Sequence, residues 1–279
     1  MSKISLGFST CPNDTFIFDA MVHQKVDTEG LEFELVLGDV EELNQKAMRG
    51  DLDVTKISYH AYSKIAGQYL ILDAGSALGY KNGPLLISKY KIYPDEVNDI
   101  RIAIPGFNTT ANLLFNIAYP NAKNNTEYLF SDIEEAVLNN EADAGLIIHE
   151  NRFTYERKGL KKIIDLGEYW EKETGLPIPL GGIVVNRKLD KEIQHKINRV
   201  LSRSVEFAFA NPKSAYPFIK QYAQEMEEEV MYKHIELYVN DFSKDLGEAG
   251  KHAIQELYQR AISLEVLPEM RQDIFITES

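Results

Sequence analysis

Short β-like runs alternate with helical patterns through the first two thirds of the chain, and this alternation limits the fold more than any other feature. Strand-like runs occupy residues 4–8, 31–37, 53–57 and 69–73. Candidate helices stand between them at residues 14–24 and 39–50. A capping-box pattern at Asp39 opens the second helix and Gly50 closes it. Alternation of this kind predicts α/β units around mostly parallel sheets.

The alternation resumes in a second block and then stops. Residues 101–105 and 144–149 read as strands, residues 108–118 as a helix, and Ser131 opens another helix. After about residue 188 the pattern is helical alone, with apolar stripes at 3.6-residue spacing over 189–205 and 251–264. We expect this helical C-terminal segment to pack on an existing sheet, because amphipathic faces need a partner.

Two extended, proline-punctuated stretches, 84–94 and 177–186, separate the blocks. We expect residues 1–88 and 188–279 to form one discontinuous lobe and residues 95–178 to form the other. The hinge crossings are then residues 89–94 and 179–187. Two crossover strands between two α/β lobes would make a double hinge with a ligand cleft between them.

Net charge and cysteine content limit the kinds of partner and site that we expect for this chain. The 279 residues include 30 Lys and Arg against 43 Asp and Glu, a net charge of −13 that would repel a phosphate backbone. Nucleic acid and membranes are therefore not expected partners, and a small molecule is. The only cysteine, Cys11, excludes an intrachain disulfide and a multi-cysteine zinc site. No apolar run approaches the ~20 residues that span a bilayer, and the N-terminus turns polar by Ser9, so we expect a cytoplasmic protein.

One candidate binding element is the segment that follows the strand at 101–105. Asn108, Thr109 and Thr110 open a helix there, so backbone N–H groups and two hydroxyls meet at the positive end of a helix dipole. That arrangement suits a carboxylate or phosphate. The alternative is that Asn108 or Thr109 only caps the helix. The sequence contains neither GxGxxG nor GxxxxGK[ST], so a nucleotide is not indicated.

His149 is the candidate base. It ends a strongly apolar strand, and strand ends in α/β sheets face the ligand crevice. Desolvation there would tune an imidazole for proton transfer near neutral pH. A hydrogen-bonded structural histidine is the alternative. A metal site is a poorer hypothesis because the other histidines are scattered and no HExxH occurs.

Lys56 and the loop after the first strand are the remaining candidates. Lys56 lies in a mostly apolar strand and would meet an anion in the cleft, or else extend to water. Ser58, at the same strand end, is a second group expected to reach the ligand from that lobe. Asn13 and Asp14 close the loop that contains Cys11. A cysteine nucleophile there would gain from the following helix N-terminus, but a cap-and-turn role is the better interpretation.

Four segments together resemble a known family. They are Ser9 to Phe16 (STCPNDTF), Thr55 to Ala61 (TKISYHA), Gly106 to Ala111 (GFNTTA) and Ala144 to Glu150 (AGLIIHE). In combination they resemble the 1,4-dihydroxy-6-naphthoate synthases of the futalosine route to menaquinone. The likeness covers most of residues 3–187, and the helical tail matches only in general character.

The resemblance implies a periplasmic-binding-protein type II-like fold and a cofactor-independent lyase, with no metal or organic cofactor. It implies cyclic dehypoxanthine futalosine as substrate and 1,4-dihydroxy-6-naphthoate as product. The family's substrate-binding positions fall on Thr55, Lys56, Ile57, Thr109 and Thr110, and its proton acceptor falls on His149; we add Asn13, Asp14 and Ser58 as candidate binding residues. Chorismate dehydratase of the same pathway and a non-catalytic carboxylate-binding protein are the alternatives.

Overall fold

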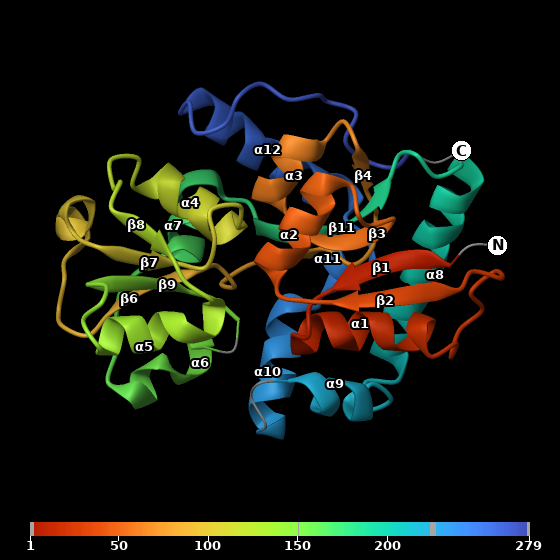
Figure 1. Cartoon of the computed structure of the whole chain (residues 1–279), viewed down its shortest axis with the longest axis horizontal. Coiled ribbons are helices and arrows are strands. Elements are labelled where there is room, and N and C mark those ends of the chain that lie inside the picture. The colour runs from red at the N-terminus through yellow and green to blue at the C-terminus, as the bar shows by residue number, and fades with distance from the viewer. Residues whose placement is uncertain (1–2, 150, 224–226, 278–279) are drawn as a thin grey trace.

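A computed structural model describes residues 3–149, 151–223 and 227–277, which form two β-sheets with helices packed around them (Figure 1). The first sheet has the strand order β2-β1-β3-β11-β4, and β5 also pairs with β11. Its strands are β1 (Ile4–Phe8), β2 (Phe33–Leu37), β3 (Val54–Ser58), β4 (Tyr69–Ile71), β5 (Ala77–Gly79) and β11 (Ile178–Asn186). β1 is parallel to β2 and β3, whereas β11 is antiparallel to its neighbours.

The second sheet has the order β10-β6-β9-β7-β8. Its strands are β6 (Leu85–Ser88), β7 (Ile102–Ile104), β8 (Asn125–Glu127), β9 (Ala144–Ile147) and β10 (Lys161–Asp165). β7 runs parallel to both β8 and β9, and β6 is antiparallel to β9 and β10. Consequently β1 and β9, the two strands expected in different lobes, lie in different sheets.

Local sequence signals account for several helix ends. α2 (Val40–Arg49) begins after Asp39, whose side chain accepts a hydrogen bond from the Glu42 N–H, and it ends at Gly50 with a φ of 77°. Both ends match the predicted capping residues. The other helices on the first two blocks are α1 (Pro12–Val22), α3 (Tyr59–Ile65), α4 (Thr110–Ala118), α5 (Ile133–Leu138), α6 (Asn151–Thr154) and α7 (Leu166–Thr174), with 3₁₀ turns at Pro94–Asp99, Phe130–Asp132 and Tyr155–Lys158.

The C-terminal segment is helical, as the apolar stripes predict. It comprises α8 (Lys191–Ala210), α9 (Tyr216–Tyr222), α10 (Glu228–Tyr238), α11 (Asp241–Lys244) and α12 (Gly247–Ser263). The buried face of α8 packs beside α1, where the Ser204 hydroxyl donates to the Ile17 carbonyl at 2.6 Å. α12 covers the first sheet from the other side, and the Tyr258 hydroxyl donates to the Tyr59 carbonyl at 2.9 Å (Figure 1).

The chain passes between the sheets at other residues than the sequence predicts. Residues 179–187, expected to be a crossing, instead lie almost entirely in β11 of the first sheet, and residues 85–88, expected in the first lobe, form β6 of the second. The chain therefore passes from the first sheet to the second at residues 80–84 and returns at residues 175–177. The cause is burial: every residue of β11 is buried, which pairing on both sides achieves and an exposed crossing would not.

Candidate active site

A cavity of about 300 Å³ lies where the carboxyl ends of β1, β3, β7 and β9 meet, the edge at which α/β sheets bind ligands. Its volume suits a small molecule. The lining residues come from both sheets and from the helical tail: Ser9 to Asp14, Asp39 to Glu41, Lys56 to Ser58, Ala77, Pro105, Thr109 to Ala111, Leu129 to Ser131, Ile148, His149, Leu180, Gly181 and Tyr238.

The structure brings almost all of the predicted site residues together around this cavity. The predicted residues that line it are Asn13, Asp14, Lys56, Ile57, Ser58, Thr109, Thr110 and His149. Thr55 is the exception, since it does not line the cavity. Its side chain is fully buried, and its hydroxyl donates to the Lys56 carbonyl at 2.9 Å. Successive strand residues face opposite sides, and Thr55 faces Gly7, where a Cβ would lie 2.7 Å from the threonine hydroxyl.

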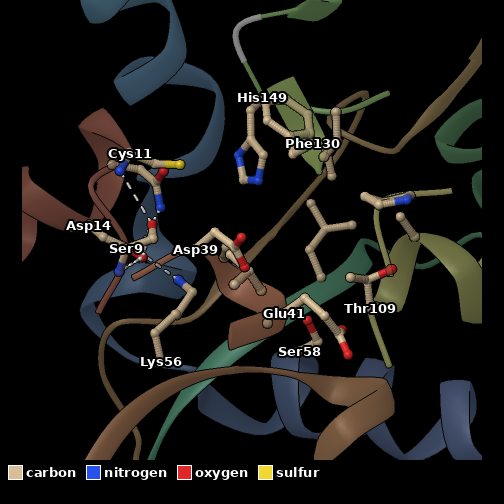
Figure 2. A pocket seen from close by; sticks show the side chains of 18 of the residues that line it. Ser9, Cys11, Asp14, Asp39, Glu41, Lys56, Ser58, Thr109, Phe130 and His149 are labelled. Carbon is tan, nitrogen blue, oxygen red and sulfur yellow. Dashed lines mark hydrogen bonds and ion pairs between the residues drawn. The ribbon is translucent and has the colours of Figure 1, made fainter. Parts of the chain in front are cut away.

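Lys56 belongs to a buried ion pair. Its ammonium donates to Asp14 Oδ1 at 2.9 Å, and the exposed fractions of the two residues are 6% and 1%. The same oxygen accepts from the Asn13 amide at 2.8 Å, and Oδ2 accepts from the Ser9 hydroxyl at 2.7 Å (Figure 2). Lys56 therefore neither extends to water nor stands as an uncompensated cation in the cavity.

The N-terminus of α4 faces the cavity as predicted. Thr109 is its N-cap: the hydroxyl accepts from the Asn112 N–H at 3.3 Å and donates to the Gly106 carbonyl at 2.8 Å. Thr109 therefore caps the helix, and it also lines the cavity. The Thr110 hydroxyl accepts from the His60 N–H at 3.4 Å. Beside them, burial lowers the pKa of His60 to about 4.

His149 lies two residues beyond the end of β9, which stops at Ile147. Its backbone takes a left-handed φ of 61°, and its N–H donates to the Tyr238 hydroxyl at 3.1 Å. The ring points into the cavity (Figure 2) and lies edge-on to Phe130, with ring centroids 5.2 Å apart. Burial is the largest influence on the imidazole and lowers the pKa of His149 to about 4, with Asp14 opposing and Lys56 reinforcing that shift.

His234 and Tyr238 on α10 also belong to the site and were not predicted from the sequence. His234 is fully buried, its ring is stacked on His149 with centroids 5.6 Å apart and planes inclined by 14°, and its Nε2 lies 2.7 Å from Asn13 Oδ1. Both residues belong to a helical stripe that also contains Met231 and Ile235. A stripe of that kind reads as core, so the available signal was the buried polar pair at i, i+4 spacing within it.

Glu41 was missed as well. It is 8% exposed, and its carboxylate accepts hydrogen bonds from Asn44 on its own helix and from Asn108 beyond β7. Burial raises the pKa of Glu41. Gly106 lies against it with a φ of 139°, and a Cβ at Gly106 would lie 2.7 Å from Glu41 Oε2. Only glycine fits this close approach between α2 and the segment after β7.

The described residues include neither a cluster of metal ligands nor a helix that could span a membrane. Within the described ranges, no His, Cys, Asp and Glu side chains gather in threes to hold a metal ion. Of the helices in the same part of the chain, none combines the length and apolar character that crossing a membrane requires.

Comparison with known proteins identifies relatives over nearly the whole chain. The model of the family described as menaquinone biosynthesis matches residues 4–263. A 1,4-dihydroxy-6-naphthoate synthase of Thermus thermophilus is 42% identical over 261 residues, 94% of each chain. The enzyme of the same name from Streptomyces coelicolor is 37% identical over 278 residues, 97% of this chain and 96% of its own.

Solved structures confirm the predicted fold. A protein of Archaeoglobus fulgidus superposes with a TM-score of 0.90 at 38% identity, covering 95% of this chain and 98% of its own. The ligand-binding component of an ABC-type import system from Staphylococcus aureus superposes with a TM-score of 0.72 at 13% identity, covering 99% and 97%. An alkanesulfonate-binding protein of Xanthomonas axonopodis gives 0.73 at 12%, covering 96% and 95%. The architecture is therefore that of the periplasmic binding proteins.

Proposed function

The chain belongs to the menaquinone biosynthesis family and is an enzyme of that pathway, and from this premise we propose its reaction and the residues that perform it. We propose that it is a lyase that converts cyclic dehypoxanthine futalosine to 1,4-dihydroxy-6-naphthoate. In this proposal His149 is the general base.

The observation that carries the proposal is that the His149 imidazole points into the cavity (Figure 2). A base acts only in its deprotonated form, and burial keeps His149 deprotonated at neutral pH. The ring accepts one carbon-bound proton of the substrate, and the electron pair of that C–H bond enters the carbocycle as the sugar-derived fragment leaves. Aromatisation of the carbocycle supplies the driving force, so one positioned base suffices.

The substrate carboxylate is assigned to the N-terminus of α4. Free N–H groups and the helix dipole favour an anion there, beside Thr109 and Thr110. Ser58 faces the same cavity, and because its hydroxyl accepts from the Asn44 amide at 3.1 Å, its own hydrogen can be donated to the ligand. Lys56 contributes less to anion binding than its charge suggests, since Asp14 already neutralises it.

The test measures turnover and binding in the same preparation. The purified protein is incubated separately with cyclic dehypoxanthine futalosine and with chorismate, which also examines the chorismate dehydratase and binding-protein alternatives. We expect naphthoate from the first substrate only. His149→Asn should lower kcat at least ~10²-fold, the usual scale for loss of a general base, with a much smaller change in affinity for the product.

The matched control is His252→Asn, the same change at an exposed position of α12. It should leave turnover unchanged. Wild-type turnover by His149→Asn, with circular dichroism showing a folded protein, would eliminate His149 as the base. Equal loss of turnover and folding would return it to a structural role.

We also propose that the two sheets and their helices form lobes that close on the ligand. The cavity is lined from both sheets, so a ligand within it bridges them. Small-angle scattering should show a smaller radius of gyration at saturating product. An unchanged radius would contradict closure.

A further inference from the structure

Lys56, Asp14, Asn13 and His234 are linked by hydrogen bonds from β3 to the ring that stacks on His149. Their donors and acceptors fix the orientation of the Asn13 amide. Lys56 and the Asn13 amide nitrogen both donate to Asp14 Oδ1, at 2.9 and 2.8 Å. Because the Asn13 amide nitrogen faces a carboxylate, its oxygen Oδ1 must face the other way. A flipped amide would place two oxygens together in a buried site. The Asn13 orientation is therefore set by the Lys56–Asp14 ion pair.

That orientation decides the tautomer of His234. Its Nε2 lies 2.7 Å from Asn13 Oδ1, an acceptor only, so Nε2 carries the hydrogen. His234 is fully buried, and burial together with His149 and Lys56 lowers the pKa of His234 well below its usual range. The residue is thus a neutral imidazole anchored through one N–H.

The His149 ring, in contrast, is oriented by ring contacts. Its Nδ1 is buried and has no hydrogen-bond partner among the described residues. Catalytic histidines are ordinarily oriented through that nitrogen by a carboxylate or a carbonyl. Here the His149 ring instead stacks on the His234 ring, with centroids 5.6 Å apart, and lies edge-on to the Phe130 ring, with centroids 5.2 Å apart. Tyr238 lies one turn beyond His234 on α10, and its hydroxyl accepts a hydrogen bond from the His149 backbone N–H.

From these contacts we propose, on the premise that His149 is the base, that His234 is a positioning residue for it: the His234 ring orients the His149 ring, and Asn13, Asp14 and Lys56 hold His234 in place. His234 exchanges no proton with the substrate. It replaces, by stacking, the hydrogen bond that a base of this kind would otherwise receive. Asn13 and Asp14 then serve the base rather than the ligand.

The titratable groups around His149 bear on the test. Asp14 faces it from α1, Lys56 from β3, and His234 and Tyr238 from α10, while Cys11, Asp39 and Glu41 line the same cavity. The substitutions chosen leave all of these except His234 in place. A change in the pH profile therefore reports the loss of the His234 ring.

Two variants at one position separate the ring from its hydrogen bond. His234→Phe keeps a stacked ring and loses the N–H, whereas His234→Gln keeps a donor toward Asn13 and loses the ring. We expect His234→Gln to lower kcat about tenfold or more, in line with the cost of a misplaced catalytic group, and His234→Phe to stay within about threefold of wild type. Product affinity should change little in both.

The acid limb of the kcat profile and the His149 imidazole resonances supply a readout that a merely structural role would not move. In His234→Gln the pKa of His149 should rise toward 6.5 by at least about one unit, since water then reaches the ring. In His234→Phe it should stay low. His149→Asn assigns the resonance, and His252→Gln at an exposed position of α12 is the matched control.

The outcomes distinguish this inference from its premise. Wild-type kcat and an unmoved His149 resonance in His234→Gln would overturn the positioning role. Equal losses in both variants with unmoved resonances would show that His234 acts only in folding. If His149→Asn retains wild-type turnover, the proposed base fails. The resonance shifts would still report whether His234 controls the His149 environment.

Discussion

Lys56→Met tests how the site tolerates a buried charge. Lys56 is 6% exposed and Asp14 is 1% exposed, so removing the ammonium leaves a carboxylate in a nearly dry environment. Three donors remain on Asp14: the Ser9 hydroxyl, the Ser9 N–H and the Asn13 amide. Breaking one partner of a buried pair costs about 3–5 kcal/mol, and with three donors left we expect about 3 kcal/mol.

The double variant Lys56→Met/Asp14→Asn determines whether the cost comes from the stranded charge. It removes both charges and should recover about 1–2 kcal/mol relative to Lys56→Met, because replacing both partners avoids the unpaired ion. Urea unfolding at pH 7 measures each free energy. The control is Lys46→Met, where Lys46 pairs with the half-exposed Glu42 and the loss should stay within about 0.5–1 kcal/mol. If Lys56→Met costs no more than Lys46→Met, or if the double variant is at least as destabilised as Lys56→Met, the buried-pair reasoning is wrong.

Three further predictions concern other parts of the site. The Thr110 hydroxyl accepts from the His60 N–H and can donate its hydrogen to the carboxylate, so Thr110→Val should weaken product binding by about 1.5–3 kcal/mol; Thr109→Val should change the affinity less, since that hydroxyl already donates to the Gly106 carbonyl, and unchanged affinity by calorimetry in Thr110→Val would refute the side-chain clamp. The pKa of His60 is about 4 in the folded protein against 6.5 when unfolded, so the unfolded state binds the extra proton between those values and stability falls as pH drops from 6.5 to 4. That loss is about 3 kcal/mol, and His60→Gln should reduce the fall in urea titrations across the same pH window by about this amount, while His149 and His234, whose pKa values are also lowered, keep their own contributions; an unchanged fall would show that His60 does not contribute to it. Gly106→Ala should destabilise the protein by at least about 1 kcal/mol in thermal unfolding, since the residue has a φ of 139° and faces the Glu41 carboxylate; Glu41→Ala should relieve part of that cost, and no relief would contradict the contact.

The sequence predicted those parts of the fold that local chemistry determines. β1 and the ends of α2 follow from apolar patterning and from capping by Asp39 and Gly50, which involve neighbours in sequence. The passages between the sheets were misplaced because β11 looks like a punctuated linker. Its role depends on pairing with strands more than a hundred residues earlier, which no local pattern reveals.

The site residues that were predicted are likewise marked by local sequence, whereas those that were missed reach the cavity through distant packing. Ser58, Thr109 and His149 stand at or just beyond a strand end or where a helix begins, and the strand-end rule for α/β sheets marks such positions. His234 lies in the middle of a helix that reaches the cavity only through tertiary packing. Thr55 was predicted as a binding residue together with Lys56 and Ile57 because of the family resemblance. Its side chain faces away from the cavity, since successive strand residues face opposite sides.

The position of β11 also sets the order in which the protein can be completed during synthesis. β11 pairs with β3 on one side and β4 on the other, so the first sheet remains split until residues 178–186 have left the ribosome. Every strand of the second sheet, β6 through β10, is translated before that. The segment that begins the chain is therefore the last to become a finished sheet, and until then its open strand edges are available for wrong pairing. Nascent chains stalled before residue 178 should need a chaperone for their N-terminal half and not for residues 85–174.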